Sequence, residues 1–196
     1  MPVLAVGYGP RVSVTPASVL RPGLLSGRAV AAPAPWAMEL GALGAEVVTP
    51  PPLAAGDDDG AFVRWAGELA AVDVIVGGAS HQAPLESAVE SLWLTIRAVA
   101  VTHWIDRDRD GAVLLVAPRP HPEPHAGALR AALENLARTL SIEWARYGIR
   151  TTTVLPGDQT ADDEIATLLA FLASPAAAYW SGCVVELGAA APSSHV

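Results

Sequence analysis

Side chains that can do acid–base or metal chemistry gather in one proline-rich stretch, "APRPHPEPH", at positions 117–125. His121, Glu123 and His125 alternate there with prolines, and extended proline geometry places alternate side chains on one side of the chain. Imidazole and carboxylate groups arranged in this way can ligate a metal or exchange protons with a substrate. A solvated loop explains the same pattern, so we keep these three residues as alternative site candidates.

Two further patterns have ordinary structural explanations. The stretch "DRDRDG" at 106–111 resembles the start of a calcium loop, but its twelfth position is Ala117, where a bidentate Glu is needed. We interpret it as a solvated turn and predict no metal site. The single cysteine, Cys183, lies in the apolar run "CVVEL" and is interpreted as a strand thiol rather than a nucleophile.

The elements that must position any site follow from hydrophobic spacing. A long helix over 128–147 has one apolar face, because large side chains recur there at steps of three and four. These side chains are Leu129, Leu133, Leu136, Leu140 and Trp144. Gly148 supplies the left-handed residue that ends helices, and a β-branched strand follows it.

Along the chain, short apolar strands alternate with helical patterns, which is typical of a parallel sheet with helices on both faces. Strands are predicted at 28–32, 46–49, 72–78, 112–117, 151–155 and 183–187. Helices are predicted at 36–44, 60–70, 86–105, 128–147 and 162–174. We expect one α/β domain over 27–190, preceded by an extension over 1–26 with two edge strands and followed by a tail over 191–196.

Composition limits the classes of function. The chain has 196 residues, of which 52% are hydrophobic and 16% charged, so it can bury a substantial core. Its net charge of −8 and scattered arginines argue against nucleic acid as a partner. No segment approaches twenty uninterrupted apolar residues, and the first residues do not read as a signal peptide. We therefore expect no membrane partner and a cytoplasmic location.

From about Gly27 to Gly188 the chain resembles the short-chain dehydrogenase/reductase family. The most specific match is "RAALENLARTLSIEWARYGIRTTTVLPG" followed by "DDEIATLLAFLASPAAAYWSGCVVELG". The resemblance implies a Rossmann-like, doubly wound parallel sheet. It also implies a truncated version, with the glycine loop, one β-α unit and the substrate lid reduced or missing.

The catalytic positions implied by this resemblance carry other residues. Enzymes of the family keep a Tyr four residues before a Lys, and these positions hold Ala126 and Arg130. The catalytic Ser maps to Ala117 or Pro118, and its supporting Asn maps to Glu90. Alanine has no proton to give, so we expect no confident catalytic residue of the family type.

The cofactor side departs in a similar way. A dinucleotide site uses a glycine-rich turn between the first strand and first helix, so that backbone N–H groups approach the pyrophosphate. Here that turn reads "AAPAPW", and proline lacks the donor. Sequence analysis therefore predicts no cofactor and treats NAD(P) binding as doubtful.

The favoured interpretation is a non-catalytic subunit that assembles with a competent homologue of the family, or forms a homodimer. The interface is predicted on two apolar helices and on the residues before the last strand. It comprises Leu92, Trp93, Ile96, Ala100, Trp104, Leu129, Leu133, Leu136, Leu140, Trp144 and Trp180. The alternative is a repurposed enzyme that binds a small molecule and catalyses a cyclisation, isomerisation or dehydration. A third interpretation is an NAD(P)-dependent oxidoreductase with an atypical site.

Overall fold

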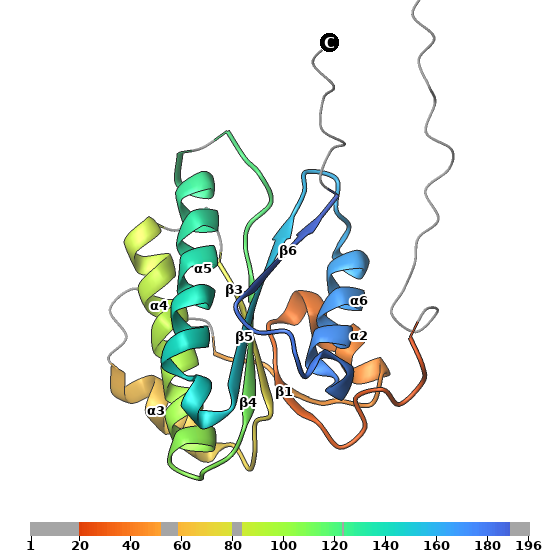
Figure 1. Ribbon diagram of the computed structural model, residues 1–196, viewed down its shortest axis with the longest axis vertical. Helices are drawn as coiled ribbons and strands as arrows, with labels where there is room; N and C mark the ends of the chain where they lie inside the picture. The colour runs from red at the N-terminus through yellow and green to blue at the C-terminus, as the bar shows by residue number, and fades with distance from the viewer. Residues whose placement is uncertain (1–19, 52–58, 80–83, 123, 189–196) are drawn as a thin grey trace, which may run out of the picture.

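A single parallel sheet organises the computed structural model, which describes residues 20–51, 59–79, 84–122 and 124–188. Its strand order is β2-β1-β3-β4-β5-β6, and every pairing is parallel (Figure 1). The strands are β1 (Ala29–Ala31), β2 (Glu46–Val48), β3 (Val74–Gly78), β4 (Gly111–Val116), β5 (Ile149–Pro156) and β6 (Cys183–Leu187). The order reverses between β1 and β3, which is where open α/β sheets form a crevice.

Helices cover both faces of the sheet, as the alternating pattern predicted. They are α2 (Ala34–Ala42), α3 (Asp59–Glu68), α4 (Leu85–Val99), α5 (Pro124–Glu143) and α6 (Asp162–Ala173). Helices α2 and α6 lie together on one face, and α3, α4 and α5 lie on the other (Figure 1). The predicted α/β class with a Rossmann-like parallel sheet is confirmed.

Alternate strand residues feed two separate cores, because successive side chains point to opposite faces. Val74 and Val76 of β3 pack under α2 and α6, whereas Ile75 between them packs under α4. Strands buried on both faces read as continuous apolar runs, which explains "GAVLLV" in β4.

The predicted strand positions are confirmed, with small shifts in their ends. The strand β6 occupies its predicted range, whereas β5 begins two residues early, at Ile149, because Gly111 of β4 pairs with it. Gly148 adopts φ 70° directly before β5, the left-handed conformation that its position predicted. The predicted edge strands of the N-terminal extension lie outside the described residues.

The helix predicted over 86–105 changes form in its last turns. After α4 the chain continues as a π-helix, Ala100–Ile105. In this segment the indole N–H of Trp104 donates to the carbonyl oxygen of Val72 at 2.6 Å. His103 Nε2 lies 2.9 Å from the carbonyl oxygen of Ala66. The wider turn thus directs two consecutive side chains at neighbouring segments, which apolar spacing does not reveal.

The interface prediction needs correction for seven residues. Leu92, Ile96, Ala100, Trp104, Leu129, Leu133 and Leu140 are buried within this chain. Six of them belong to one buried apolar cluster of the protein's own core, and Leu140 is also buried, at 4% exposed. Trp93, Leu136 and Trp144 keep part of their surface, and Trp180 is exposed. Of the residues predicted for the interface, only these four stay candidates for a subunit contact.

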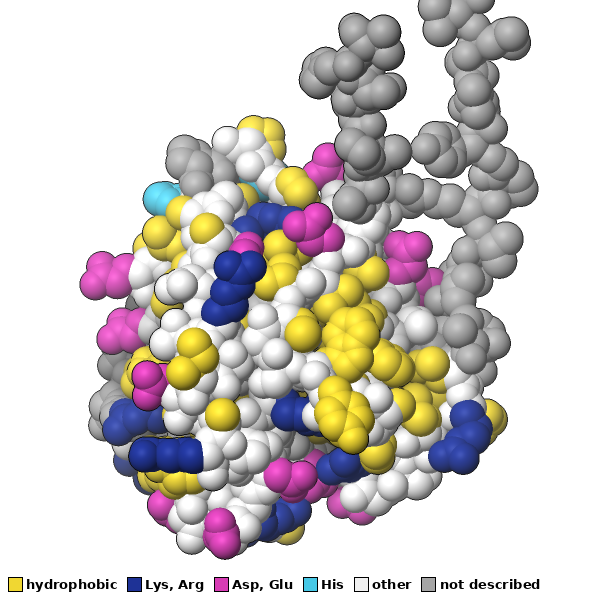
Figure 2. Space-filling view, viewed as in Figure 1, with side chains coloured by type: hydrophobic (Ala, Val, Ile, Leu, Met, Phe, Trp, Pro, Cys, Tyr) yellow, Lys and Arg dark blue, Asp and Glu magenta, His cyan; other side chains and the backbone are white. Residues whose placement is uncertain are grey.

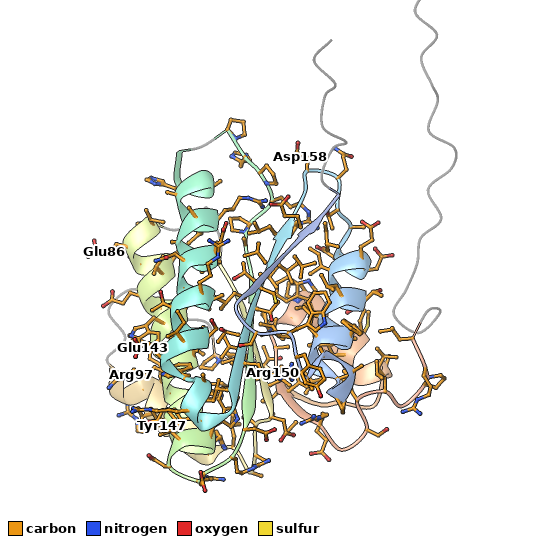
Figure 3. All side chains as sticks on the ribbon, viewed as in Figure 1. Glu86, Arg97, Glu143, Tyr147, Arg150 and Asp158 are labelled. Atoms are coloured by element: carbon orange, nitrogen blue, oxygen red, sulfur yellow. The ribbon has the colours of Figure 1, made fainter. Side chains whose placement is uncertain are left out.

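The two ends of the sheet differ in what they present. Asp158 lies where the strands end, and Tyr147 lies toward the opposite end of the molecule (Figure 3). Glu86 and Arg97 lie on the outer side of α4, away from the sheet (Figure 3).

Within the described ranges, no helix has the length and apolar character needed to cross a membrane.

Candidate functional site

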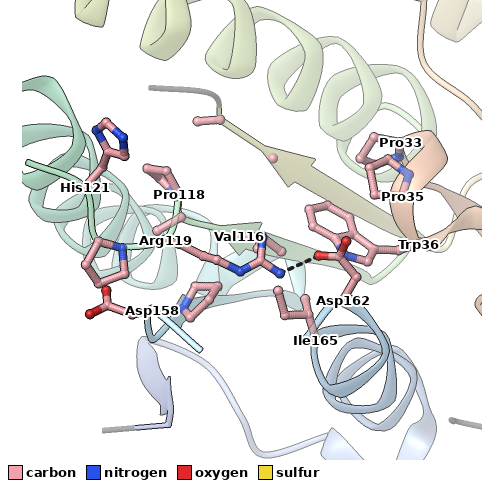
Figure 4. A pocket seen from close by; sticks show the side chains of 15 residues that line it. Pro33, Pro35, Trp36, Val116, Pro118, Arg119, His121, Asp158, Asp162 and Ile165 are labelled. Carbon is pink, nitrogen blue, oxygen red and sulfur yellow. Dashed lines mark hydrogen bonds and ion pairs between the residues drawn. The ribbon is translucent and has the colours of Figure 1, made fainter. Parts of the chain in front are cut away.

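A cleft opens at the carboxyl ends of β1, β3, β4 and β5, beside the point where the strand order reverses. This first cleft has a volume of about 670 Å³. Its walls include Pro33, Pro35, Trp36, Gly78, Val116, Pro118, Arg119, Pro120, His121, Pro156, Asp158, Asp162 and Ile165. Figure 4 shows Pro33, Pro35 and Trp36 on one side and Pro118, His121 and Asp158 on the other.

Arg119 ties two walls of the first cleft together. Its Nη2 lies 2.6 Å from Oδ1 of Asp162 in the first turn of α6, and its Nε donates to the carbonyl oxygen of Thr160 at 2.9 Å. The Thr160 hydroxyl accepts a bond from Gly157 N–H at 2.9 Å and donates to the carbonyl oxygen of Leu187 at 3.1 Å. The connection between β5 and α6 is therefore fixed by its own hydrogen bonds.

Arg130 and Ala126 take the positions that the resemblance assigned to catalysis. Nη1 of Arg130 donates to the carbonyl oxygens of Pro118 at 2.7 Å and Pro156 at 2.8 Å, so it joins the ends of β4 and β5. Ala126 is fully buried in α5, and Ala117 is buried at the end of β4. These contacts are structural, and none of them leaves a proton donor facing the cleft.

The other candidates are dispersed. His121 lines the first cleft, whereas His125 is exposed in the first turns of α5. Glu90 is exposed on α4 and lines neither cleft described here. Glu123 lies outside the described residues. Among the described residues, no three His, Cys, Asp or Glu side chains come close enough to hold a metal ion.

Sequence reasoning missed Trp36, which is a wall of the first cleft. Its side chain follows β1 immediately, in the first turn of α2, and is only 8% exposed. The indole packs so closely on Gly78 that an added Cβ there would lie 3.0 Å from its Cη2. Among the described residues, its Nε1 has no hydrogen-bond partner. The signal for this residue was its place directly after the first strand.

A second cleft of about 620 Å³ lies on the other side of the sheet end. Pro33, Gly78 and Ala79 line both clefts, so the two cavities adjoin at the end of β3. The hydroxyl-bearing residues of the second cleft are Thr49, Ser87, Ser91 and Thr95. Gly77 lies under it, and a Cβ there would meet Cδ1 of Leu92. Two consecutive glycines thus let α2 and α4 approach β3 from opposite faces.

His103 is a titratable side chain buried away from both clefts. Its burial lowers the pKa of the imidazole, and the nearby Arg107 and Arg109 lower it further, against the opposing effects of the Ala66 carbonyl and Asp73. Among the described residues, Nδ1 of His103 has no hydrogen-bond partner. The ring is therefore a neutral core group.

Known proteins similar to this chain are dehydrogenases and reductases. A probable 2,4-dienoyl-CoA reductase of Bacillus subtilis is 31% identical in an alignment 122 residues long, with a coverage of 45% of this chain and 48% of that protein. The chain thus spans about half the length of this curated relative. No family model matches the sequence.

Solved structures share the fold at lower identity. A citronellol catabolism dehydrogenase of Pseudomonas aeruginosa superposes with a TM-score of 0.70 at 22% identity, covering 86% of this chain and 96% of that one. An enoyl-[acyl-carrier-protein] reductase (NADH) of Aquifex aeolicus gives 0.67 at 18% identity, covering 83% and 95%. These likenesses establish the fold and support the resemblance to short-chain dehydrogenases/reductases.

The prediction that no cofactor is used is wrong. Similar proteins are dehydrogenases and reductases by name, and one of them names NADH, which points to a nicotinamide cofactor rather than to none. The prediction rested on the proline-containing turn after β1, where Pro35 has no N–H and the N–H of Trp36 donates to the carbonyl oxygen of Pro33 at 3.1 Å. A glycine loop is only one means of holding such a cofactor.

The residues of the two clefts fit the ring end of a nicotinamide cofactor. The first cleft lies at the crevice where α/β sheets bind dinucleotides, and apolar walls suit a flat ring. The indole N–H of Trp36, which has no acceptor in the described part of the chain, is a buried donor on a residue of this wall. The adjoining second cleft gives an extended molecule room to continue across the sheet end.

Proposed function

We propose that this chain is a nicotinamide-binding protein of the short-chain dehydrogenase/reductase type that does not complete a reduction alone. It works as a subunit beside a competent homologue of the same fold. The observation that carries this proposal is the pair of bonds from Arg130 to the carbonyl oxygens of Pro118 and Pro156, one turn of α5 from the buried Ala126.

Cofactor binding is supported by the two adjoining clefts. The ring end lies in the first cleft against Trp36, and the remainder passes over Gly78 and Ala79 toward the hydroxyl groups of the second. Such a cofactor supplies a hydride when bound. The chain's own contribution is to orient it and to exclude water with proline-rich walls.

The proposal that the chain alone completes no reduction is supported by the kinds of proton donor that line its first cleft. A carbonyl that receives a hydride also needs a proton from a positioned acid. Within the described part of the chain, no Ser, Thr or Tyr lines the first cleft, and His121 lies across the cleft from Trp36, against which we place the ring. The guanidinium of Arg130 donates hydrogen bonds to the main-chain oxygens of Pro118 and Pro156 and is therefore directed at the protein's own backbone. We therefore place the proton donor on another subunit or another segment.

Assembly is supported by apolar surface that the fold leaves uncovered. Trp93 and Trp144 stack with ring centroids 5.8 Å apart where α4 and α5 meet, and Leu136 lies on the same helix pair. A second patch lies over α6 and the turn before β6, where Phe171 packs edge-on against Trp180 and Tyr179 is 97% exposed (Figure 2). Aromatic side chains are enriched in protein interfaces.

The test combines cofactor titration, turnover and mass. We expect NADH or NADPH fluorescence to change saturably with the purified chain, and carbonyl and enoyl substrates to show no reduction. A tagged pull-down from the host, followed by native mass spectrometry, is expected to give a stoichiometric complex with a dehydrogenase homologue. Reduction by the purified chain alone, or the absence of any such homologue from the complex, would contradict the proposal.

Substitutions test whether α5 forms the contact with the other subunit. Leu136→Asp places a charge in the proposed interface and should dissociate the complex. Met38→Asp is the matched control, because Met38 is 77% exposed on α2, on the other face of the sheet. Circular dichroism of both variants separates loss of contact from loss of fold. A complex of unchanged mass in Leu136→Asp would remove α5 from the interface.

A redox-neutral enzyme is the second candidate, because His121, Asp158 and Asp162 line one cleft. An imidazole and a carboxylate can share proton transfers without a hydride. Turnover of a small metabolite without added cofactor, abolished in His121→Gln, would favour this function. Saturable cofactor binding without such turnover favours the first.

A further inference from the structure

Two buried tryptophans of this protein differ in how their indole N–H groups are satisfied. Trp104 is fully buried, and its Nε1 donates to the carbonyl oxygen of Val72 at 2.6 Å. Trp36 is nearly as buried, yet its Nε1 has no acceptor within the described residues. A buried donor without a partner is unfavourable, and an acceptor supplied by a ligand would remove that cost.

The surroundings hold the indole of Trp36 at the wall of the first cleft. Its six-membered ring lies against Gly78, where an added Cβ would be 3.0 Å from Cη2 and 3.2 Å from Cζ3. Pro33 and Pro35 flank it along the chain and restrict the backbone on both sides. Trp36 lies across the cleft from Pro118 and His121 (Figure 4).

Charge in the first cleft narrows the chemistry of a ligand beside Trp36. Asp158 and Asp162 line it with one arginine, Arg119, whose guanidinium is 2.6 Å from Asp162. The nearby carboxylates outnumber the cation, which disfavours a phosphate at this point and suits an uncharged or cationic ring. Proline walls offer apolar contact but no N–H, so few uncharged donors face the ligand.

We propose that the indole N–H of Trp36 is the donor that orients a flat ring in the first cleft by binding its carbonyl or carboxamide oxygen. This inference rests on the proposed cofactor binding, in which that ring is the nicotinamide group. Trp36 is a positioning residue for the ring and takes no part in proton transfer. The ring-plus-amide chemistry also describes free nicotinamide, which makes a small probe available.

One competing partner lies on the same helix. Oε2 of Glu39, one turn further along α2, is likewise buried without a hydrogen-bond partner in the described chain. A donor and an acceptor this close in sequence can serve each other through a bridging water. The experiment must therefore distinguish a ligand oxygen from the Glu39 carboxylate.

The test uses the whole chain labelled with ¹⁵N at its tryptophan indoles. Trp36→Phe assigns the Trp36 resonance, and nicotinamide is then titrated into the unsubstituted protein. NADH affinity is measured in parallel for the unsubstituted chain, for Trp36→Phe and for Trp65→Phe, the control on α3. We expect nicotinamide to shift the Trp36 indole resonance saturably. We also expect Trp36→Phe to weaken NADH binding about tenfold, with Trp65→Phe unchanged.

The other possible results of the nicotinamide and NADH titrations distinguish the role of Trp36 from cofactor binding. Equal NADH affinity in all three proteins, with an unmoved Trp36 resonance, overturns the role of Trp36 and leaves cofactor binding intact. A shift with nicotinamide but no NADH binding supports this donor and overturns cofactor binding. No response to either probe overturns both. A Trp36 resonance that moves in ligand-free Glu39→Gln, and not with nicotinamide, assigns the N–H to Glu39 and overturns the inference.

Discussion

On the β4–β5 side of the first cleft, the guanidinium groups of Arg119 and Arg130 each reach two oxygen atoms of neighbouring segments. On the α2 side, Nε1 of Trp36 and Oε2 of Glu39 have no partner within the described chain. Buried polar groups are normally paired, and the proposal that a ligand pairs with the α2 side rests on this difference between the two sides. We call the β4–β5 side, with Arg119 and Arg130, the frame, and the α2 side, with Trp36 and Glu39, the receptive wall.

The largest effect is expected where the frame is complete. Arg130→Met leaves the carbonyl oxygens of Pro118 and Pro156 without their donor at the ends of two central strands. Hydrogen bonds to charged groups contribute about 1.5–3 kcal/mol each, and we expect the unfolding free energy to fall by about 2–4 kcal/mol. Urea denaturation measures it, with Arg130→Lys as the control that keeps one donor group. A loss below about 0.5 kcal/mol in Arg130→Met would show that these bonds do not hold the frame.

The core beyond the clefts provides the next test, through His103. Burial lowers its pKa below the ordinary value near 6.5, so the unfolded chain binds the proton more readily. Stability should therefore be fully present above pH 6.5 and decrease as the pH falls through 6.5 toward the lowered folded pKa. We expect His103→Leu to flatten this slope in denaturation curves between pH 7.5 and 5. The exposed His125→Asn is the control, and an identical slope in His103→Leu would contradict the assignment.

The smallest effect concerns the receptive wall and uses one chemical change at two sites. Trp36→Phe removes a donor that has no acceptor among the described residues, whereas Trp104→Phe removes one that bonds to the carbonyl oxygen of Val72. We expect Trp36→Phe to cost about 1–2 kcal/mol less than Trp104→Phe, because an unmade bond carries no loss. Thermal denaturation of the two variants measures the difference. Equal costs would show that the two indole N–H groups do not differ in pairing.

The sheet was predictable because its strands carry an unambiguous pattern. The run from Ala112 to Ala117 is apolar throughout and bounded by turn residues, and it proved to be the buried β4. The faces of α4 and α5 were equally clear as patterns, yet Leu133 and Ile96 pack inside the chain rather than on a partner. Hydrophobic spacing shows that a face is covered and does not show by which molecule.

The cleft was harder to predict because its contacts join residues far apart in sequence. Arg130 reads as part of a solvated helix face, and only the folded chain brings it to the carbonyl groups of Pro118 and Pro156. Trp36 has the apolar character of a core residue, and only the folded chain places it in the wall of the first cleft. The cofactor prediction failed because it depended on the composition of one turn, "AAPAPW". The crevice itself is formed by the topology of the sheet.

Gly78 lines both clefts and Gly77 lines the second, so the backbone at the end of β3 lies between the two. A methyl group on Gly77 would collide with Leu92, and one on Gly78 would press on Trp36. The space that two more side chains would take is filled by Leu92 and Trp36, so each glycine lets one cleft wall pack directly on the strand. Alanine at position 77 would press on Leu92 in the wall of the second cleft, and alanine at position 78 on Trp36 in the wall of the first, so each glycine sets the width of one cleft.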